Sequence, residues 1–352
     1  MSEKMKAVVL HGPDNYPDNY EVTEIDKPVC GDGEILLKMK VASICGTDKK
    51  IFTGAKTKDV RPDSVVGHEF SGIIEEVGKN VKGFAAGDRV SIANVIPCGH
   101  CVACLSGHEN ACMERKAIGY EFNGGFAEYV LIPEICVEAG NVIKLPDDVS
   151  FAAGAIIEPL ACCIRGFKNT GTQFGDTVLI IGAGPIGLMH TQLNIAGGAK
   201  KVYVSDFDAK KRAIAESFGA VGIDPTAQDI EQFIKEETGG LGVDRVVMTV
   251  GINDMVNQMF KICKKFGTVC LFAGFPRGKT SVIDPSIIHY NEIKVTGSSA
   301  YKREDYLQAA GMVFEKKIDL DALVSDRFAL EDFRKALDLH MEATGLKIVI
   351  ED

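Results

Sequence analysis

The sequence lacks any apolar run near the length of about 20 residues that a membrane-spanning helix needs. Its opening, Met1 to Lys6, also lacks the apolar segment of a secretory signal peptide. We therefore expect a cytoplasmic protein without a membrane partner. An excess of positive charge is absent too, because the formal net charge is −10 and the lysines and arginines are dispersed. Nucleic acid is not an expected partner, since binding it requires a concentrated basic face.

Length and the order of sequence patterns predict two domains of an α/β protein. The chain has 352 residues and 46% hydrophobic composition, more than one core usually supports. Up to residue 150, short β segments alternate with Gly, Pro and Asp turns, which predicts a β-rich domain. Over residues 151–297, strands alternate with helices, a pattern typical of a doubly wound parallel sheet. Residues 298–352 supply helices and a final strand, and we expect them to return to the first domain.

The most specific motif for a cofactor is Gly182-x-Gly184-x-x-Gly187, which follows an apolar run of strand length and opens an apolar run of helix length. In such a motif the first glycine permits the turn, the second lets the backbone approach a pyrophosphate, and the third lets helix and strand pack closely. The amino end of the helix then presents free N–H groups to phosphate. The sequence therefore predicts a dinucleotide site.

An acidic residue at the end of the next strand-like run supports that prediction. Asp206 lies nineteen residues past Gly187, where a carboxylate accepts hydrogen bonds from the ribose hydroxyls. A carboxylate there repels a 2′-phosphate, which favours NAD, whereas the nearby positive charges of Lys210, Lys211 and Arg212 weaken that preference and keep NADP open as the alternative. The expected cofactor-binding residues are Gly182, Gly184, Pro185, Ile186, Gly187, Asp206 and Arg212.

Four of the 11 cysteines stand in metal-ligand spacing, at Cys98, Cys101, Cys104 and Cys112. Reduced thiols are expected in a chain without a secretory signal. Four thiolates close a tetrahedron around Zn²⁺ and leave no open position, which predicts a structural zinc site. An iron–sulfur cluster is the competing interpretation, although the last gap of seven residues does not match the bacterial ferredoxin pattern.

A second, dispersed set comprises Cys45, His68, Glu69 and Glu158. Each residue alone has an ordinary explanation as a core thiol, a satisfied imidazole or a solvated carboxylate. Together they offer sulfur, nitrogen and oxygen ligands, a set that holds Zn²⁺ through three side chains and leaves one position open. The set predicts a catalytic zinc, giving two zinc ions per chain. Spacing does not rank Glu69 against Glu158 as the direct ligand.

These motifs together resemble the zinc-dependent medium-chain dehydrogenases, in the branch of sorbitol and other polyol dehydrogenases and threonine dehydrogenase. The resemblance implies a GroES-like β domain with an inserted Rossmann domain, and zinc bound by Cys45, His68 and a glutamate. It also implies that Thr47 passes the substrate proton outward and that Asp48 orients His68. The motifs are Cys45-Gly-Thr-Asp48, Gly67-His-Glu69, the four-cysteine segment, Gly124-Gly-Phe-Ala-Glu-Tyr129, Glu158-Pro-Leu-Ala161 and Gly182-Ala-Gly-Pro-Ile-Gly187.

We therefore expect an NAD- and zinc-dependent oxidoreductase that converts a secondary alcohol of a polyol or polyol phosphate into a ketone. An amino-alcohol dehydrogenase acting on L-threonine shares every motif, and a non-catalytic protein that binds zinc and nucleotide is the alternative from another class. Where many relatives carry a histidine that ends the proton relay, this chain has Lys50, for which contact with an anionic substrate group is one hypothesis and a solvated surface position the other. By the same resemblance, we expect a homodimer or homotetramer.

Overall fold

The computed structural model describes residues 2–276 and 278–352. The chain forms two compact units: the first runs to Pro159 and resumes over Lys302–Asp352, and the second is Leu160–Tyr301. Helix α4, Phe151–Thr170, contains the division between them. The domain boundaries expected at residues 150 and 297 stay predictions.

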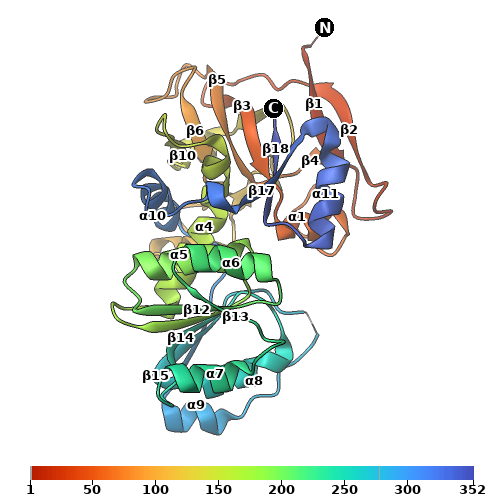
Figure 1. Cartoon of the computed structure of the whole chain (residues 1–352). Coiled ribbons are helices and arrows are strands. Elements are labelled where there is room, and N and C mark those ends of the chain that lie inside the picture. The colour runs from red at the N-terminus through yellow and green to blue at the C-terminus, as the bar shows by residue number, and fades with distance from the viewer. Residues whose placement is uncertain (1, 277) are drawn as a thin grey trace. The chain divides into compact units, whose positions relative to one another are not determined.

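The first unit is built on a seven-stranded, mainly antiparallel sheet with strand order β10-β6-β5-β3-β18-β17, to which β9 adds by pairing with β3. The unit also contains a three-stranded sheet, β2-β1-β4 (Figure 1), and the two-stranded β7-β8. The strands are β1 Lys4–Leu10, β2 Tyr20–Asp26, β3 Ile35–Ser43, β4 Ser64–Val65, β5 Glu69–Val77, β6 Arg89–Ile92, β7 Val95–Ile96, β8 Lys116–Ala117, β9 Tyr129–Ile132, β10 Val142–Lys144, β17 Val324–Ala329 and β18 Lys347–Glu351. Its helices are α1 Gly46–Phe52, α2 Val102–Leu105, α3 Glu134–Glu138, the first part of α4, α10 Arg303–Phe314 and α11 Phe333–Glu342, with short 3₁₀ turns at Glu109–Ala111, Asp321–Leu323 and Leu330–Asp332.

The end of the chain is part of this sheet. Strand β18 pairs antiparallel with β3, with Val349 opposite Ser43. Helix α11 covers the core beside it, where the ring of Phe333 lies 4.7 Å from that of Phe126 and 5.5 Å from that of Phe52. Strand β3 lies inside the sheet, so its backbone N–H and C=O groups need partners on both sides, and the last strand supplies some of them.

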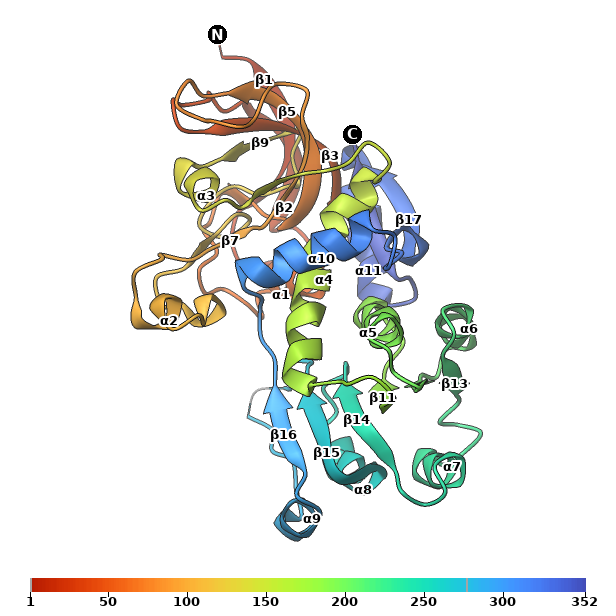
Figure 2. The ribbon, with the colours of Figure 1, turned by 90° about the vertical axis from the view of Figure 1, so that its left-hand side faces the viewer.

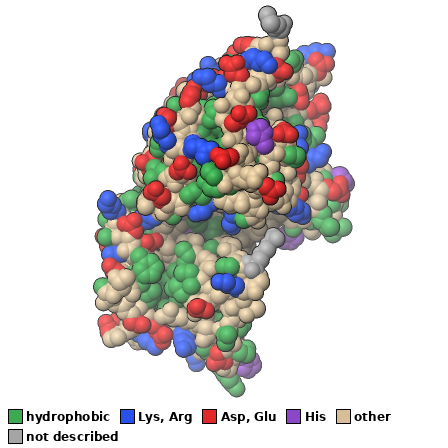
Figure 3. Space-filling view, turned by 90° about the vertical axis from the view of Figure 1, so that its right-hand side faces the viewer, with side chains coloured by type: hydrophobic (Ala, Val, Ile, Leu, Met, Phe, Trp, Pro, Cys, Tyr) green, Lys and Arg blue, Asp and Glu red, His purple; other side chains and the backbone are tan. Residues whose placement is uncertain are grey.

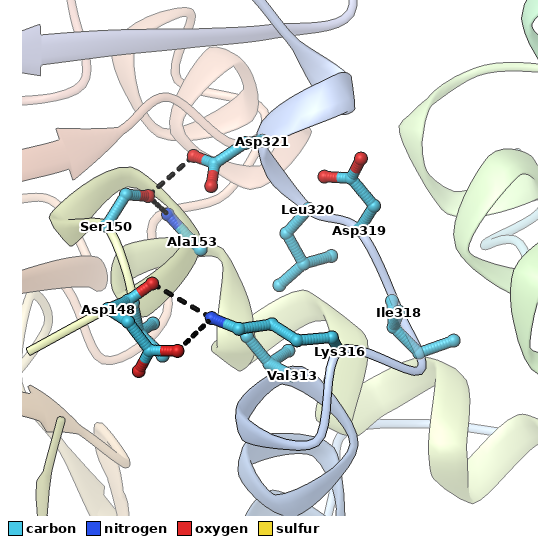
Figure 4. A pocket seen from close by; sticks show the side chains of 10 residues that line it. Asp148, Ser150, Ala153, Val313, Lys316, Ile318, Asp319, Leu320 and Asp321 are labelled. Atoms are coloured by element: carbon cyan, nitrogen blue, oxygen red, sulfur yellow. Dashed lines mark hydrogen bonds and ion pairs between the residues drawn. The ribbon is translucent and has the colours of Figure 1, made fainter. Parts of the chain in front are cut away.

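Polar contacts join the returning segment to the start of α4 (Figure 4). Asp148 forms an ion pair with Lys316 at 2.9 Å, and the Ser150 hydroxyl donates to the Asp321 carboxylate at 2.5 Å. These residues line a cavity of about 320 Å³ together with Leu320 and other side chains of both segments. The charged partners are largely exposed, so we assign them a positioning role with little stabilisation.

The second unit is a six-stranded parallel sheet of strand order β13-β12-β11-β14-β15-β16. This is the order of a dinucleotide-binding sheet, with its reversal point between β11 and β14. Figure 2 shows β14, β15 and β16 side by side with α8 and α9 against them. The strands are β11 Thr177–Ile181, β12 Lys201–Ser205, β13 Val221–Ile223, β14 Val243–Met248, β15 Cys263–Leu271 and β16 Lys294–Gly297. The helices are α5 Pro185–Ala196, α6 Ala209–Ser217, α7 Ile230–Glu237, α8 Val256–Ile262 and α9 Pro285–Asn291, with a 3₁₀ turn at Asn253–Met255.

One local expectation concerns Pro159, which the sequence predicts to end or kink its helix. The helix does not end there, because α4 continues through Pro159 to Thr170. Proline removes the N–H that would bond to the carbonyl of Ala155. The helix persists because Ile156, Ile157 and Leu160 around it are fully buried.

Two further observations concern the helices and the distribution of charge. Among the described residues, no helix combines the length and apolarity needed to cross a membrane. On the face shown in Figure 3, basic and acidic side chains are mixed rather than gathered by sign.

Candidate active site and metal centres

Strand register brings the first site residues together. Strands β3 and β5 are antiparallel, with Ser43 opposite Glu69. Cys45 follows the last residue of β3 by two positions, and His68 immediately precedes β5. Because the two strands are antiparallel neighbours, both residues lie at the same end of the strand pair. The Cys45 sulfur, a His68 ring nitrogen and a Glu69 carboxylate oxygen all lie within 4.8 Å of one another.

Asp48 fixes two members of this set. One of its carboxylate oxygens accepts the backbone N–H of Cys45 at 2.8 Å, and the other lies 3.3 Å from Nδ1 of His68. The Asp48 side chain is fully buried, and Cys45 caps the amino end of α1 by accepting the N–H of Thr47 at 3.4 Å. The first turn of α1 therefore orients both the thiol and the imidazole, and the contact on Nδ1 leaves Nε2 for another partner.

Glu69 is fully buried and forms an ion pair with Lys347 of β18, itself nearly buried. Its other carboxylate oxygen, Oε1, has no hydrogen-bond partner among the described residues. Glu158 of α4 is close enough to feel the charges of His68 and Glu69, and burial raises its pKa to about 7. Glu158 does not join the three-residue set within 4.8 Å in the described chain.

The residues fit a bound metal ion. Sulfur, nitrogen and oxygen atoms converge, and a buried carboxylate oxygen in the set is unpartnered. Burial alone would lower the pKa of His68, yet the Asp48 carboxylate, together with the adjacent Tyr120 and Cys45, raises that pKa well above its usual value. An environment that favours positive charge this strongly suits a cation, and the donor set is one that Zn²⁺ accepts.

The four-cysteine segment has the geometry of a closed tetrahedral site. All four sulfur atoms lie within 4.8 Å of one another, with separations of 3.5 Å for Cys101–Cys104, 3.8 Å for Cys101–Cys112 and 3.9 Å for Cys98–Cys104. Four sulfurs at about 2.3 Å from a zinc ion stand about 3.8 Å apart. The Cys98 N–H points to the Cys112 sulfur and the Cys101 N–H to the Cys98 sulfur, both at 3.4 Å.

A third group with metal-ligand geometry shares Cys98 with this segment. It adds the exposed side chains of His100 and Glu114, whose ring nitrogen and carboxylate oxygen are 3.5 Å apart. Cys98 cannot serve both groups, and four sulfurs complete a zinc shell without His100. The segment is held from α10 by Arg303, whose guanidinium donates to the carboxylate of Glu109 at 2.6 Å.

The glycine motif occupies the turn from β11 to α5. An added Cβ on Gly187 would stand 1.9 Å from the carbonyl oxygen of Gly182, so only glycine lets the helix pack at this distance. Gly184 caps α5 with open space around its Cα, and Pro185 begins the helix, with Ile186 next. The first N–H groups of α5 are therefore accessible to an anion.

Asp206 ends β12, the neighbour of β11, and its carboxylate accepts the N–H of Ala183 at 2.6 Å and that of Asp208 at 2.8 Å. Arg212 lies beside it, but its guanidinium donates to the carbonyls of Asp206 and Phe207 and to the carboxylate of Asp224. The arginine thus orders the turn that presents Asp206.

Two lysines near the first site have no signal in the sequence. Lys347 is 278 residues from its partner Glu69, and only the pairing of β18 with β3 reveals the contact. Lys56 follows α1 in a polar stretch, and its place over an aromatic ring appears only in the fold.

Comparisons with known proteins agree with this architecture. Residues 31–147 match the family model of the alcohol dehydrogenase GroES-like domain, and residues 185–315 match that of zinc-binding dehydrogenases. A D-arabitol-phosphate dehydrogenase from Enterococcus avium is 33% identical, with 100% of this chain and 98% of the relative covered. An L-threonine 3-dehydrogenase from Bacillus velezensis is 32% identical, with 99% of each covered. A solved structure described as a zinc-binding dehydrogenase from Sinorhizobium meliloti 1021, bound to NADP, has a TM-score of 0.92 at 33% identity and covers 100% of both chains.

The chain belongs to the zinc-dependent medium-chain dehydrogenases, in the branch of polyol and threonine dehydrogenases. This confirms the predicted fold class, a GroES-like β-rich domain with a Rossmann parallel sheet. The protein is an oxidoreductase of the alcohol and polyol dehydrogenase type that uses zinc and a nicotinamide cofactor.

Proposed function

We propose that this protein is an NAD- and zinc-dependent dehydrogenase that oxidises a secondary alcohol of a polyol or polyol phosphate to the ketone. The observation that supports the proposal is the convergence of Cys45, His68 and Glu69 around one point, where the last residues of β3 lie beside the first residues of β5. A zinc ion bound there would supply Lewis acidity that lowers the pKa of a substrate hydroxyl.

The side chains around this point have separate tasks. Cys45 and His68 would hold the metal with a carboxylate, and Asp48 keeps both in place. Glu69 is the carboxylate within reach in this structure, although Lys347 shares its charge; Glu158 is the second candidate. Thr47, half-buried in the first turn of α1, is proposed to accept the hydroxyl proton and pass it outward while hydride moves to the nicotinamide.

A second zinc ion, bound by the four cysteines, is proposed to be structural. The sulfur separations fill a tetrahedron, so no position remains for substrate. Two zinc ions per chain are therefore expected on metal analysis of the purified protein.

NAD is the proposed cofactor, although one relative of known structure binds NADP. The Asp206 carboxylate is fixed where the ribose hydroxyls would bind, and its charge opposes a 2′-phosphate. Arg212 supports this choice, because its guanidinium is already taken by Asp224 and two carbonyls and does not offer a phosphate site.

An anionic substrate is supported by the relatives. D-arabitol phosphate carries a phosphate and L-threonine a carboxylate, so both named substrates combine a secondary alcohol with an anionic group. L-threonine oxidation stays the second candidate function on this ground. We also propose a cytoplasmic homodimer or homotetramer, supported by β16, which lies at the edge of its sheet.

The test is NADH formation by the zinc-loaded protein with D-arabitol, D-arabitol 1-phosphate and L-threonine. We expect turnover of a polyol or its phosphate, lost in Cys45→Ser and retained in Cys30→Ser, a thiol outside both clusters. Turnover of L-threonine alone would establish the second candidate. Full activity of Cys45→Ser at normal zinc content would refute the site, and two bound zinc ions with no turnover of any alcohol would favour the non-catalytic alternative.

A further inference from the structure

Tyr120 extends the site away from the metal-binding residues. Its ring lies 5.4 Å from the His68 ring, at an interplanar angle of 37°. The loop that carries it packs directly on the backbone before His68: an added Cβ on Gly119, which has a φ of +88°, would meet the Gly67 carbonyl oxygen at 2.6 Å. Only glycine permits this approach, so the position of Tyr120 beside His68 is built into the loop.

Lys56 lies over the Tyr120 ring. Its ammonium nitrogen is 4.5 Å from the centroid of Tyr120, a cation–π distance. The backbone holds the lysine there, because its N–H donates to the Lys50 carbonyl at 2.9 Å and so folds the chain back after α1. Since the ring-to-ring distance is 5.4 Å, the ammonium lies within about 10 Å of the His68 imidazole.

The charge of Lys56 is incompletely compensated. The ammonium donates to the carbonyl of Lys58 at 2.9 Å, and no carboxylate of the described residues forms an ion pair with it. Asp59 and Glu121 act on it only from a distance, opposed by Arg115 and Lys58. The side chain is half-buried, and burial lowers the pKa of Lys56. A partly desolvated ammonium without a counter-ion gains more from an anion than a solvated one does.

We propose that Lys56 binds the anionic group of the substrate, a phosphate or a carboxylate, while the alcohol to be oxidised lies at the site of Cys45 and His68. The inference rests on the proposed function and adds a specificity residue to it. The span is compatible, because an extended carbon chain advances about 1.2 Å per bond and a phosphate or carboxylate a few carbons from the alcohol falls within reach.

Lys50, the lysine that the sequence singled out for this contact, is exposed at the end of α1. It therefore serves as the matched control, since the two lysines are joined by one backbone hydrogen bond and differ in burial and in the aromatic contact. Lys56→Met removes the charge and retains an unbranched side chain, and Lys56→Arg restores a cation over the ring.

The experiment measures kcat and KM of the zinc-loaded wild type and the three variants with D-arabitol 1-phosphate, L-threonine and uncharged D-arabitol. In Lys56→Met we expect KM for one anionic substrate to rise about 10- to 100-fold with kcat within about twofold, and KM for D-arabitol to stay unchanged. Lys56→Arg should recover most of the affinity, and Lys50→Met should match the wild type. Comparing the rise in KM for D-arabitol 1-phosphate with that for L-threonine shows which anionic group Lys56 recognises.

Equal effects of Lys56→Met on charged and uncharged substrates, or none on either, would overturn the inference while leaving the proposed function intact. If no alcohol is turned over, the proposed function fails, and calorimetric titration of the same holoenzymes with D-arabitol 1-phosphate and L-threonine decides the role of Lys56. If Lys56→Met weakens binding and Lys50→Met does not, the proposed role of Lys56 is supported. If Lys56→Met leaves binding unchanged, or if the wild type does not bind either compound, that role is refuted.

Discussion

His190 makes the second unit sensitive to acid. The side chain lies in α5, is fully buried, and packs edge-on against Phe272 with ring centroids 4.7 Å apart. Neither ring nitrogen has a hydrogen-bond partner among the described residues. Burial without compensation disfavours the charged form, which lowers the pKa of His190 to about 3 from 6.5.

The sign of the effect follows from proton binding. Between pH 6.5 and 3, the unfolded chain holds a proton on this residue that the folded chain lacks. The free energy of unfolding therefore falls as pH falls, and the stability present above 6.5 is lost progressively below it. At about pH 5 the loss is about 2 kcal/mol, because the native imidazole is still neutral and the unfolded-state pKa alone sets the difference.

The perturbation is His190→Leu, which keeps a similar volume and removes both nitrogens. The assay is urea unfolding at about pH 7.5 and about pH 5, followed by circular dichroism because the chain has no tryptophan. At a slope of about 2 kcal/mol per molar, the wild-type midpoint should drop by about 1 M more than that of the variant. Replacement of the exposed His289 by Gln should leave the wild-type drop intact. Equal drops in the wild type and His190→Leu would refute the reasoning.

Three further predictions concern zinc, cofactor and packing. Cys101→Ser should remove one zinc ion and lower the midpoint of thermal unfolding. Cys45→Ser should remove the other zinc ion and leave that midpoint nearly unchanged. If metal analysis finds both ions in either variant, the two-site assignment is wrong. Asp206→Asn retains the size of the side chain and one acceptor oxygen but removes the charge. The kcat/KM for NAD should therefore fall about 10-fold, and the ratio of kcat/KM for NAD to that for NADP should decrease. An unchanged ratio would argue against a role for this carboxylate in choosing the cofactor. Gly166→Ala should lower the free energy of unfolding, measured in urea, by about 1–3 kcal/mol, because the added Cβ would lie 2.6 Å from the Phe272 ring and 3.0 Å from the His190 ring. A free energy of unfolding equal to that of the wild type would show that these rings can move aside.

The fold was predictable because its signals are local. An apolar run followed by Gly182, Gly184 and Gly187 is enough to predict a strand, a turn and a helix, and the six-stranded sheet has the strand order of a dinucleotide-binding fold. The Cys98–Cys112 segment is equally readable, since its ligands lie within fifteen residues. The continuation of the helix past Pro159 was not predictable from the sequence pattern, because it depends on burial of the neighbouring residues, which offsets the lost hydrogen bond.

For the candidate metal site at Cys45, the sequence suggests the residue types that converge but does not rank the two glutamates. Sequence offers Glu69 and Glu158 without preference, whereas strand register puts Glu69 directly beside His68 and Cys45. The β3–β5 pairing that reveals this joins residues 26 or more positions apart, and local propensity carries no information about it. Lys56 escaped notice for the same reason, because Tyr120 reaches it from a separate loop.

The buried pair of Glu69 and Lys347 ties the formation of this site to the completion of the sheet. Glu69 sits at the first position of β5 with no exposure, and a buried carboxylate without a partner carries a penalty of several kcal/mol. The only lysine paired with it among the described residues comes from β18, at the far end of the chain. Until β18 pairs with β3, the unpaired charge of Glu69 opposes burial beside Cys45 and His68. The last strand therefore does more than close a sheet: it supplies the cation that pairs with Glu69 in the interior, beside Cys45 and His68.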